Sequence, residues 1–289
     1  MEITRKAYAK INLGLDVTGR RDDGYHLVRM IMQNIDLYDT LTFTDNESGR
    51  IKLSASSESI PTDDSNLICK VAHQLQEVYG VKKGADITLE KRIPVAAGMA
   101  GGSTDGAAAY LALNELWDLG LTTDELCRLA VKLGADIPYC IVGGTALSEG
   151  IGEVLTPLKD MPHCHIVIAK PAIAVSTGWV YTELDSRQIK KHPDIDGIRS
   201  ALEAGDIKGM CDLIGNVLED VTTSKYSIIT DIEKLLEDNG AIRAFMTGSG
   251  PTVFAIFDSK ETAQKGFEAV KKSGFAPELF LSQPINPNR

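Results

Sequence analysis

A glycine-rich stretch between residues 92 and 114 constrains this chain more than any other feature. It reads RIPVAAGMAGGSTDGAAAYLALN, with an apolar run before the glycines and an Ala/Leu-rich run after them. Gly98, Gly101, Gly102 and Gly106 follow one another closely. Regular elements exclude that much glycine unless a turn or a close backbone approach requires it. The pattern therefore predicts an extended segment, a tight loop, and a helix from about residue 105 to residue 119.

A glycine loop that opens a helix is suited to binding an anion. The first N–H groups of a helix have no partner within it, and the helix dipole adds partial positive charge there. Ser103 and Thr104 can add hydroxyl donors. The stretch is neither a P-loop, because no lysine follows the glycines, nor the spaced G-x-G-x-x-G of a dinucleotide fold. The alternative is a packing turn between helix and strand, capped by Thr104 or Asp105.

The composition limits the classes of partner. The chain has 289 residues, 43% of them hydrophobic and 24% charged, with a formal net charge of -10. Such an acidic chain is poorly suited to nucleic acid or an anionic membrane, so we expect a small-molecule substrate instead. No run reaches the roughly 20 apolar residues of a membrane span, and the first residues lack the apolar segment of a signal peptide. Five scattered cysteines without a C-x-x-C pair favour reduced thiols and a cytoplasmic location.

The rest of the chain mixes strands and helices without a regular β-α-β alternation. Between residues 9 and 17, apolar residues alternate with polar ones, which predicts a half-buried strand with Lys10 and Asn12 on its polar face. Other expected elements are a helix over 67–78 with Asn66 or Ser65 as its N-cap, a strand over 85–90, and a helix with Thr123 or Thr122 as its N-cap. A strand–glycine turn–strand near 241–257, a helix over 260–272 and a last strand near 279–281 follow.

This order of elements favours an α+β fold rather than a doubly wound parallel sheet. The length favours two domains. Pro157 and Pro162 interrupt the chain near its middle, so we place the boundary there and expect domains over residues 1–155 and 156–289.

Four segments resemble the motifs of one enzyme family. PVAAGMAGGSTDGAAA resembles the nucleotide-binding motif of the GHMP kinases, and AKINLGLDVTGRRDDGYH resembles the first motif of one branch of that family. LGADIPYCIVGGTALSEGIGE is similar to the segment with the catalytic aspartate, and MTGSGPTVFAIF to the C-terminal glycine motif. The resemblance implies a two-domain α+β architecture. Its N-terminal α/β domain carries the nucleotide loop, and its C-terminal domain is a ferredoxin-like α+β domain.

The resemblance implies ATP-dependent phosphoryl transfer to a hydroxyl group. Such transfer needs in-line positioning, charge neutralisation and an acceptor for the hydroxyl proton. Asp136 matches the catalytic aspartate and Lys10 matches the charge-stabilising lysine, and Asp136 as the N-cap of a short helix is the alternative. The residues matched to the ATP-binding motif are Pro94, Val95, Ala96, Ala97, Gly98, Met99, Ala100, Gly101, Gly102, Ser103 and Thr104.

The D-G-Y-H segment implies the branch whose acceptor alcohol carries cytidine diphosphate, in the non-mevalonate route to isoprenoid precursors. A cytosine base favours an aromatic face for stacking and a hydrogen-bond partner for its edge. Tyr25 supplies the face and His26 the edge contact, and Tyr181 matches an aromatic residue on the other side of the base. Asn12 is expected near the substrate hydroxyl. Ordinary helix packing is the alternative for Tyr181.

The nucleotide motif departs from the usual G-L-G-G-G-S-S-D-A-A of the family. Met99, Ala100, Thr104 and Gly106 replace Leu, Gly, Ser and Ala. Ala100 matters most, because its Cβ is strained in any conformation with positive φ. Gly106 is expected to weaken the helix by roughly 1 kcal/mol relative to alanine.

Two other functions remain open on the sequence. One is a GHMP kinase with another acceptor, such as homoserine or mevalonate, and the other is a ligand sensor on the same fold. The D-G-Y-H segment disfavours the former, and the presence of both Lys10 and Asp136 disfavours the latter. We expect Mg²⁺ to accompany ATP, with Ser103 as a candidate ligand. We also expect a monomer or a weak homodimer.

Overall fold

The computed structural model describes residues 1–189 and 191–287, which divide into two compact units. The first unit comprises Met1–Ala9, Leu37–Val95 and Ala100–Val142, and the second comprises Lys10–Asp36, Ala96–Met99 and the chain from Gly143 onward. The first two strands and the glycine-rich loop therefore contribute residues to both units. Each unit is thus made of three separate chain segments. The single boundary expected between residues 155 and 156 stays a prediction.

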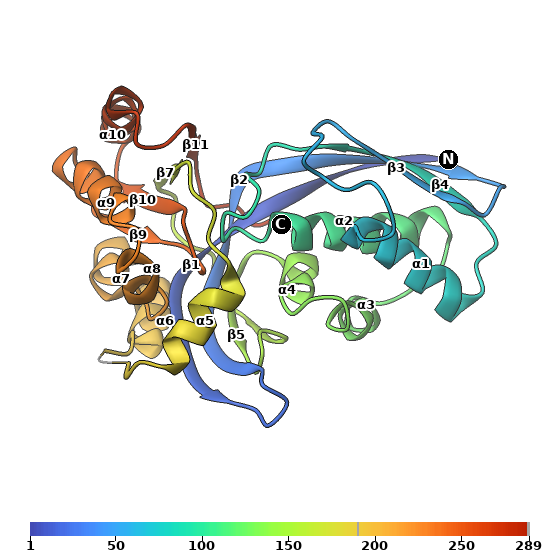
Figure 1. Ribbon diagram of the computed structural model, residues 1–289, viewed down its shortest axis with the longest axis horizontal. Helices are drawn as coiled ribbons and strands as arrows, with labels where there is room; N and C mark the ends of the chain where they lie inside the picture. Colours follow the sequence, from blue (N-terminus) through green and yellow to red (C-terminus); the bar gives the residue numbers. More distant parts are fainter. Residues whose placement is uncertain (190, 288–289) are drawn as a thin grey trace. The chain divides into compact units, whose positions relative to one another are not determined.

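The mixed α+β content expected from the sequence is confirmed (Figure 1). The strands are β1 (Glu2–Arg20), β2 (His26–Asn46), β3 (Ile51–Ala55), β4 (Gly84–Glu90), β5 (Thr145–Glu149), β6 (Val154–Pro157), β7 (His165–Lys170), β8 (Gly215–Asn216), β9 (Arg243–Met246), β10 (Val253–Phe257) and β11 (Glu278–Ser282). The helices are α1 (Leu67–Tyr79), α2 (Gly101–Leu116), α3 (Thr123–Ala130), α4 (Ile137–Val142), α5 (Thr177–Asp185), α6 (Ile195–Ala204), α7 (Ile207–Leu213), α8 (Glu219–Thr223), α9 (Ile228–Asp238) and α10 (Lys260–Ser273).

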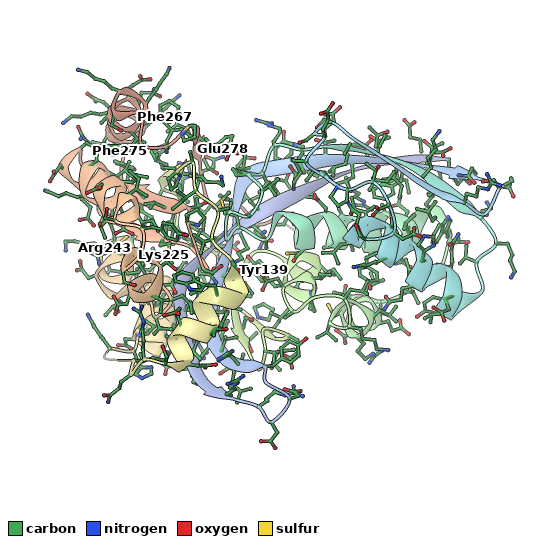
Figure 2. All side chains as sticks on the ribbon, viewed as in Figure 1. Tyr139, Lys225, Arg243, Phe267, Phe275 and Glu278 are labelled. Atoms are coloured by element: carbon green, nitrogen blue, oxygen red, sulfur yellow. The ribbon has the colours of Figure 1, made fainter. Side chains whose placement is uncertain are left out.

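The first unit packs helices against one face of a sheet. Within it, β4 pairs with β3 in parallel and with the second half of β2 in antiparallel orientation. Helices α1 to α4 lie on the same side of these strands (Figure 1). The core between them is apolar, and Phe43 and Tyr110 are fully buried in it. Tyr139 of α4, labelled in Figure 2, is also fully buried, and burial raises its pKa well above the usual value.

Local capping signals define several helix ends as the sequence predicts. Asn66 caps α1, and its side chain accepts a hydrogen bond from the N–H of Ile68. Thr122 caps α3 in a capping box with Glu125, since each side chain bonds the other residue's backbone N–H. These short-range bonds satisfy N–H groups that a helix leaves unpaired at its start, so they are readable from a few neighbouring residues.

The second unit contains a four-stranded antiparallel sheet in the order β11-β7-β10-β9. Along the chain, helices separate β7 from β9 and α10 separates β10 from β11. Helices α9 and α10 contact this sheet. The βαββαβ order with the last strand beside the first is ferredoxin-like and confirms that expectation. Lys170 of β7 also pairs at 2.7 Å with Glu278 of β11, which is labelled in Figure 2.

The predicted half-burial of β1 is wrong. Every residue from Ala9 to Asp16 is buried, so both faces of the strand are covered, and Lys10 and Asn12 are 4% and 2% exposed. The alternation of polar and apolar residues identifies the two faces correctly. It cannot show that the polar face is covered as well, because this depends on residues distant in the sequence. Lys10 and Asn12 are therefore buried polar groups that need partners.

No helix in the described part of the chain has both the length and the apolar character required to cross a membrane.

Candidate active site

The helix after the glycine loop begins earlier than the sequence predicts. Helix α2 starts at Gly101 rather than near residue 105, and its first internal hydrogen bond runs from the N–H of Thr104 to the carbonyl oxygen of Ala100 at 2.8 Å. No residue that the structure describes accepts a hydrogen bond from the N–H groups of Gly101, Gly102 or Ser103. Three donors thus remain unpaired at the positive end of a 16-residue helix. This is the geometry of an anion site.

Ala100 has a positive φ, a backbone conformation that is strained for any residue other than glycine. Its φ is 58° and its ψ 28°, in the left-handed region, and it forms the N-cap of α2 without a side-chain hydrogen bond. Ala96, earlier in the same loop, also has a positive φ of 51°. An L-residue with a Cβ is disfavoured in this region by roughly 1–2 kcal/mol. The loop therefore follows a path suited to glycine at a position where this chain has alanine.

Gly101 and Gly102 are glycine for different reasons. A Cβ on Gly101 would lie 3.0 Å from Nζ of Lys91 and 3.1 Å from Cγ2 of Ile93, so a side chain there would require these neighbours to shift by a few tenths of an ångström. A Cβ on Gly102 would have Leu67 as its nearest neighbour, at 3.9 Å, which is an ordinary contact. Packing within the protein does not require glycine at residue 102. Glycine at residue 102 leaves the backbone open to close approach.

The two hydroxyl residues of the loop also differ. Thr104 is 3% exposed and donates its hydroxyl to the carbonyl oxygen of Tyr8 at 2.8 Å, so its side chain ties α2 to β1. The hydroxyl of Ser103 is part of no hydrogen bond with the described residues. Of the predicted nucleotide-binding hydroxyls, only that of Ser103 has no partner in the described chain. The residues before α2 comprise buried Pro94, Ala97 and Met99 and exposed Val95.

The C-terminal glycine motif lies directly against the nucleotide loop. A Cβ on Gly98 would lie 2.4 Å from the carbonyl oxygen of Thr247, and a Cβ on Gly248 would lie 2.8 Å from that of Gly98. Asn216 supports the turn, because its side-chain amide donates to the carbonyl oxygens of Met246 and Gly248 at 3.1 and 2.8 Å. Asn216 is absent from the residues predicted above, and no local signal marks it.

Lys10 and Asn12 form a buried polar pair beside the same loop. Nζ of Lys10 donates to Oδ1 of Asn12 at 2.6 Å and to the carbonyl oxygen of Gly98 at 3.1 Å. The backbone N–H of Lys10 donates to the carbonyl oxygen of Met99 at 3.2 Å. An ammonium has three donors, so one of them has no partner in the described chain. Asn12 also bonds Thr247 through its N–H at 3.0 Å, which connects Lys10 to the glycine turn.

Asp136 occupies the turn before α4. Its backbone carbonyl oxygen accepts from the N–H of Cys140 at 3.1 Å, and the side chain is half-buried. Within the chain that the structure describes, its carboxylate accepts no hydrogen bond and so does not act as a helix cap. The N-cap alternative is therefore not what the structure shows. Asp136 belongs to the first unit and Lys10 to the second, and their joint action stays a prediction.

Two of the three predicted base-binding residues are in contact. The rings of His26 and Tyr181 have centroids 4.6 Å apart and are tilted by 31°. Nε2 of His26 lies 2.7 Å from Oδ1 of Asp185, and this contact lowers the pKa of Asp185. Tyr25 is 58% exposed on the loop between β1 and β2. The structure thus pairs His26 with Tyr181 and leaves the ring of Tyr25 largely exposed.

A buried ionic cluster adjoins the loop in the first unit, and the sequence did not predict it. Nζ of Lys91 pairs with the carboxyl groups of Asp39 and Asp105, the latter at 3.0 Å. Asp39 also accepts from the N–H groups of Arg92 and Ile93 at 2.5 and 2.8 Å. Burial raises the pKa of Asp105 to about 8. Lys91 directly follows β4 and precedes the glycines, but three residues from separate segments give no pattern in the sequence.

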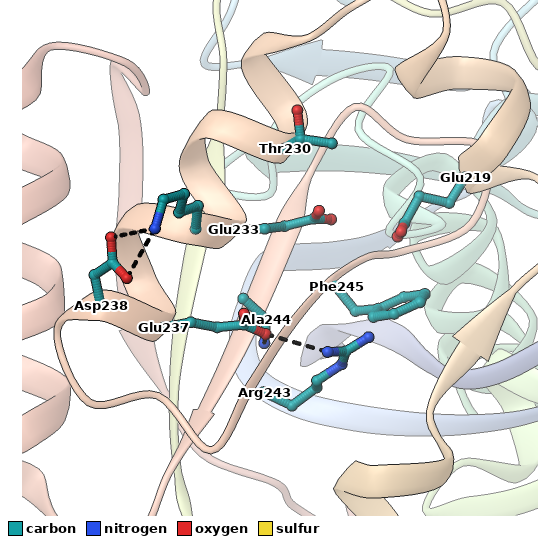
Figure 3. Close-up of a pocket in the computed structure, with 9 residues that line it drawn as sticks. Glu219, Thr230, Glu233, Glu237, Asp238, Arg243, Ala244 and Phe245 are labelled. Carbon is teal, nitrogen blue, oxygen red and sulfur yellow. Dashed lines mark hydrogen bonds and ion pairs between the residues drawn. The ribbon is translucent and has the colours of Figure 1, made fainter.

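The second unit also contains a polar hollow, and none of the predicted site residues lines it. A hollow of about 340 Å³ is lined by residues of α8, α9 and β9, among them Glu219, Glu233 and Arg243. Figure 3 shows the carboxyl groups of Glu219 and Glu233 directed toward each other. Burial raises the pKa of Glu219 to about 7 and that of Glu233 to about 9. Glu219 accepts from the N–H of Met246 at 2.8 Å, so the pair supports the strand that leads into the glycine turn.

Comparison with known proteins places the chain in a family. Residues 66–144 match the family described as "GHMP kinases N terminal domain", and residues 198–276 match "GHMP kinases C terminal". This chain belongs to the GHMP kinase family. The unpaired N–H groups of α2 fall within the first match, and the ferredoxin-like sheet overlaps the second. The GHMP kinases use ATP as phosphate donor, so this GHMP kinase is an ATP-dependent phosphotransferase.

Relatives within the family narrow the assignment. This GHMP kinase is 47% identical to a 4-diphosphocytidyl-2-C-methyl-D-erythritol kinase of Lachnoclostridium phytofermentans, over 97% of each chain. It is 48% identical to the enzyme of that name from Caldicellulosiruptor bescii, over 96% of each chain. A crystal structure of 4-(cytidine 5'-diphospho)-2C-methyl-D-erythritol kinase superposes with a TM-score of 0.82 at 29% identity, covering 98% of this chain and 99% of the other. The branch indicated by the first motif is confirmed.

Proposed function

We propose that this GHMP kinase transfers the γ-phosphoryl group of ATP to the 2-hydroxyl of 4-diphosphocytidyl-2-C-methyl-D-erythritol, in the non-mevalonate route to isoprenoid precursors. The main support for ATP binding is the group of three unpaired N–H donors at Gly101, Gly102 and Ser103. The names of relatives 47 to 48% identical over nearly the whole chain support the acceptor.

The phosphates of ATP bind at the first turn of α2 in this proposal. Backbone N–H groups and the helix dipole favour a polyanion there, and Gly102 leaves the backbone accessible. Such binding needs no net positive charge on the protein, which agrees with the acidic chain. The glycine turn around Gly248 supports the loop through its contact with Gly98.

Lys10 and Asp136 carry the chemistry. Asp136 accepts the proton of the attacking hydroxyl, and its carboxylate is available because no described residue occupies it. Lys10 stabilises negative charge with the one ammonium donor that Asn12 and Gly98 leave unused. Burial strengthens this interaction, because electrostatic stabilisation is larger where water is excluded.

The cytosine of the acceptor binds at Tyr25, His26 and Tyr181. His26 and Tyr181 already stack on each other, and Asp185 holds the His26 ring through a 2.7 Å contact. The exposed ring of Tyr25 supplies a further face for stacking. Stacking of a base on an aromatic side chain contributes about 1–3 kcal/mol.

Magnesium fits this chain as an ion that accompanies ATP. The described residues contain no group of three His, Cys, Asp or Glu side chains that could hold a metal ion. Mg²⁺ is commonly bound by substrate phosphates with few protein ligands, and the partnerless hydroxyl of Ser103 is suited to that role. When bound, the ion neutralises charge on the β- and γ-phosphoryl oxygens. The five free thiols suit a reducing compartment, and we propose the cytoplasm.

The test is ATP consumption with a panel of acceptors: 4-diphosphocytidyl-2-C-methyl-D-erythritol, mevalonate and homoserine. We expect turnover with the first acceptor only. Asp136→Asn and Lys10→Met should each lower kcat about a hundredfold or more in folded protein. Asp118→Asn, in the turn after α2, is the control and should retain activity. Turnover with mevalonate or homoserine alone contradicts the proposed acceptor, and ligand binding without turnover indicates a sensor.

A further inference from the structure

A lysine and two aspartates are buried next to the nucleotide loop, in the first unit. The side chains of Lys91, Asp39 and Asp105 are 7%, 0% and 5% exposed. They come from β2, from the segment after β4 and from the first turns of α2. Lys91 contacts both carboxyl groups, so it joins β2 to the two segments that flank the nucleotide loop.

This cluster is costly as a source of stability alone. Removing charged groups from water carries a desolvation penalty that their mutual attraction often only balances. One carboxyl oxygen of Asp105, Oδ1, is buried without any hydrogen-bond partner in the described chain, which adds to that penalty. Well-packed apolar residues in place of a buried ionic cluster are often neutral or stabilising. What the ionic cluster supplies instead is a fixed position for the segments that it joins.

The segments it fixes are the two ends of the nucleotide loop. At the start, Asp39 accepts from the N–H groups of Arg92 and Ile93. At the end, Lys91 donates to Oδ2 of Asp105 at 3.0 Å. Gly101 fits closely over the ammonium, since a Cβ there would lie 3.0 Å from Nζ. The contact between Lys91 and Asp105 therefore links the segment before the loop to the start of α2, where the three unpaired N–H groups lie.

We propose that Lys91, held by Asp39 and bonded to Asp105, is a positioning residue for ATP: its side chain sets the place of the first turn of α2. This inference rests on the proposed binding of ATP phosphates at that turn. It assigns to Asp39, Lys91 and Asp105 a role in nucleotide affinity and none in the proton transfer or in acceptor binding.

The test compares Asp105→Ala with Asp105→Asn. Alanine removes the acceptor for Lys91 but leaves the pair of Lys91 with Asp39, and asparagine retains an oxygen acceptor at the same place. We expect Asp105→Ala to raise KM for ATP about tenfold, with KM for the acceptor alcohol changed less than twofold, and Asp105→Asn to restore a KM for ATP near that of the wild type. Asp45→Ala, which removes a carboxylate of the same unit paired with Lys83, is the matched control and should change neither KM.

Gly102→Ala separates this inference from the proposed function. Its added methyl has room in the protein and lies at the unpaired N–H groups, so it raises KM for ATP when phosphates bind there. An effect of Gly102→Ala without one of Asp105→Ala overturns the positioning role alone. No effect of either variant overturns the phosphate site as well.

Equal increases of both KM values in Asp105→Ala indicate a merely structural role and also overturn the inference. Thermal melting establishes that each variant is folded. If Asp105→Ala does not fold, Lys91→Arg takes its place, because a guanidinium keeps the charge but not the position of a single ammonium. We expect Lys91→Arg to raise KM for ATP severalfold, and an unchanged KM in the folded variant contradicts the proposal.

Discussion

The backbone of Gly98 lies directly against the backbone of Gly248. A Cβ on Gly248 would lie 2.8 Å from the carbonyl oxygen of Gly98 and 3.3 Å from its Cα. Two glycine motifs on distant parts of the chain therefore meet without side chains between them. Lys10 adds to this contact, because its ammonium donates to the same carbonyl oxygen of Gly98. Gly248 is therefore required by the presence of Gly98, whereas glycine at residue 98 is required by the carbonyl oxygen of Thr247, 2.4 Å from a Cβ there.

Gly98→Ala is expected to destabilise the protein strongly. The new Cβ would lie 2.4 Å from the carbonyl oxygen of Thr247, and φ at residue 98 is +71°. Overpacking against backbone and a left-handed conformation each cost about 1–3 kcal/mol. Urea denaturation should show the loss. Gly102→Ala, which has room for its methyl, is the control, and a Gly98→Ala protein as stable as this control would show that the loop relaxes easily.

Gly106→Ala and Gly101→Ala should have opposite effects although both residues belong to α2. A Cβ on Gly106 makes only ordinary contacts, at 3.7 Å from Ile137 and Leu67, so alanine stabilises the helix by up to about 1 kcal/mol. A Cβ on Gly101 is crowded by Lys91 and Ile93, so alanine destabilises. Thermal unfolding of the two variants measures the difference. A gain in both would mean that Lys91 moves aside at little cost.

Ala100→Gly is expected to stabilise the nucleotide loop. Alanine at φ 58° carries roughly 1–2 kcal/mol of strain, and glycine removes it while losing about 0.5–1 kcal/mol through greater freedom of the unfolded chain. The net gain in the free energy of unfolding is at most about 1.5 kcal/mol. Ala108→Gly, in the middle of α2, is the comparison and should lose about 1 kcal/mol or more. A loss of similar size in Ala100→Gly would argue against strain at residue 100.

Glu219 and Glu233 should make stability fall as the pH rises above about 5. Burial raises the pKa of both carboxyl groups, to about 7 and about 9, above the ordinary value of 4.5. The folded protein thus binds more protons than the unfolded chain between pH 4.5 and 9, and the free energy of unfolding decreases over that range. Well below pH 4.5 both states are protonated and the contribution is constant.

Glu233→Gln tests this pair, because a neutral amide needs no proton to remain buried. We expect the variant to melt at a higher temperature than the wild type at pH 8, by about 2–4 °C for each 1 kcal/mol gained, and at nearly the same temperature at pH 5. Glu268→Gln, at an exposed position of α10, is the control and should leave the pH dependence unchanged. Parallel curves for the wild type and Glu233→Gln would contradict the prediction.

Local features and the kind of chemistry could be predicted from the sequence alone. The caps at Asn66 and Thr122, the glycine loop before a helix, and the strain at Ala100 all depend on residues within a few positions of one another. A helix end or a tight turn is stabilised by bonds within a single turn, so neighbouring residues are enough to predict it. The motifs around Lys10 and Asp136 likewise indicate phosphoryl transfer, because each motif is a short run of adjacent residues.

What surrounds those features depends on how the whole chain packs. Lys10 is buried, Gly98 meets Gly248, and Lys91 joins Asp39 to Asp105. Each of these relationships brings together segments distant in the chain, and no local pattern records which segments will meet. Burial and close backbone contact are therefore decided by the tertiary structure, whereas a sequence motif identifies only residues that contribute to the site.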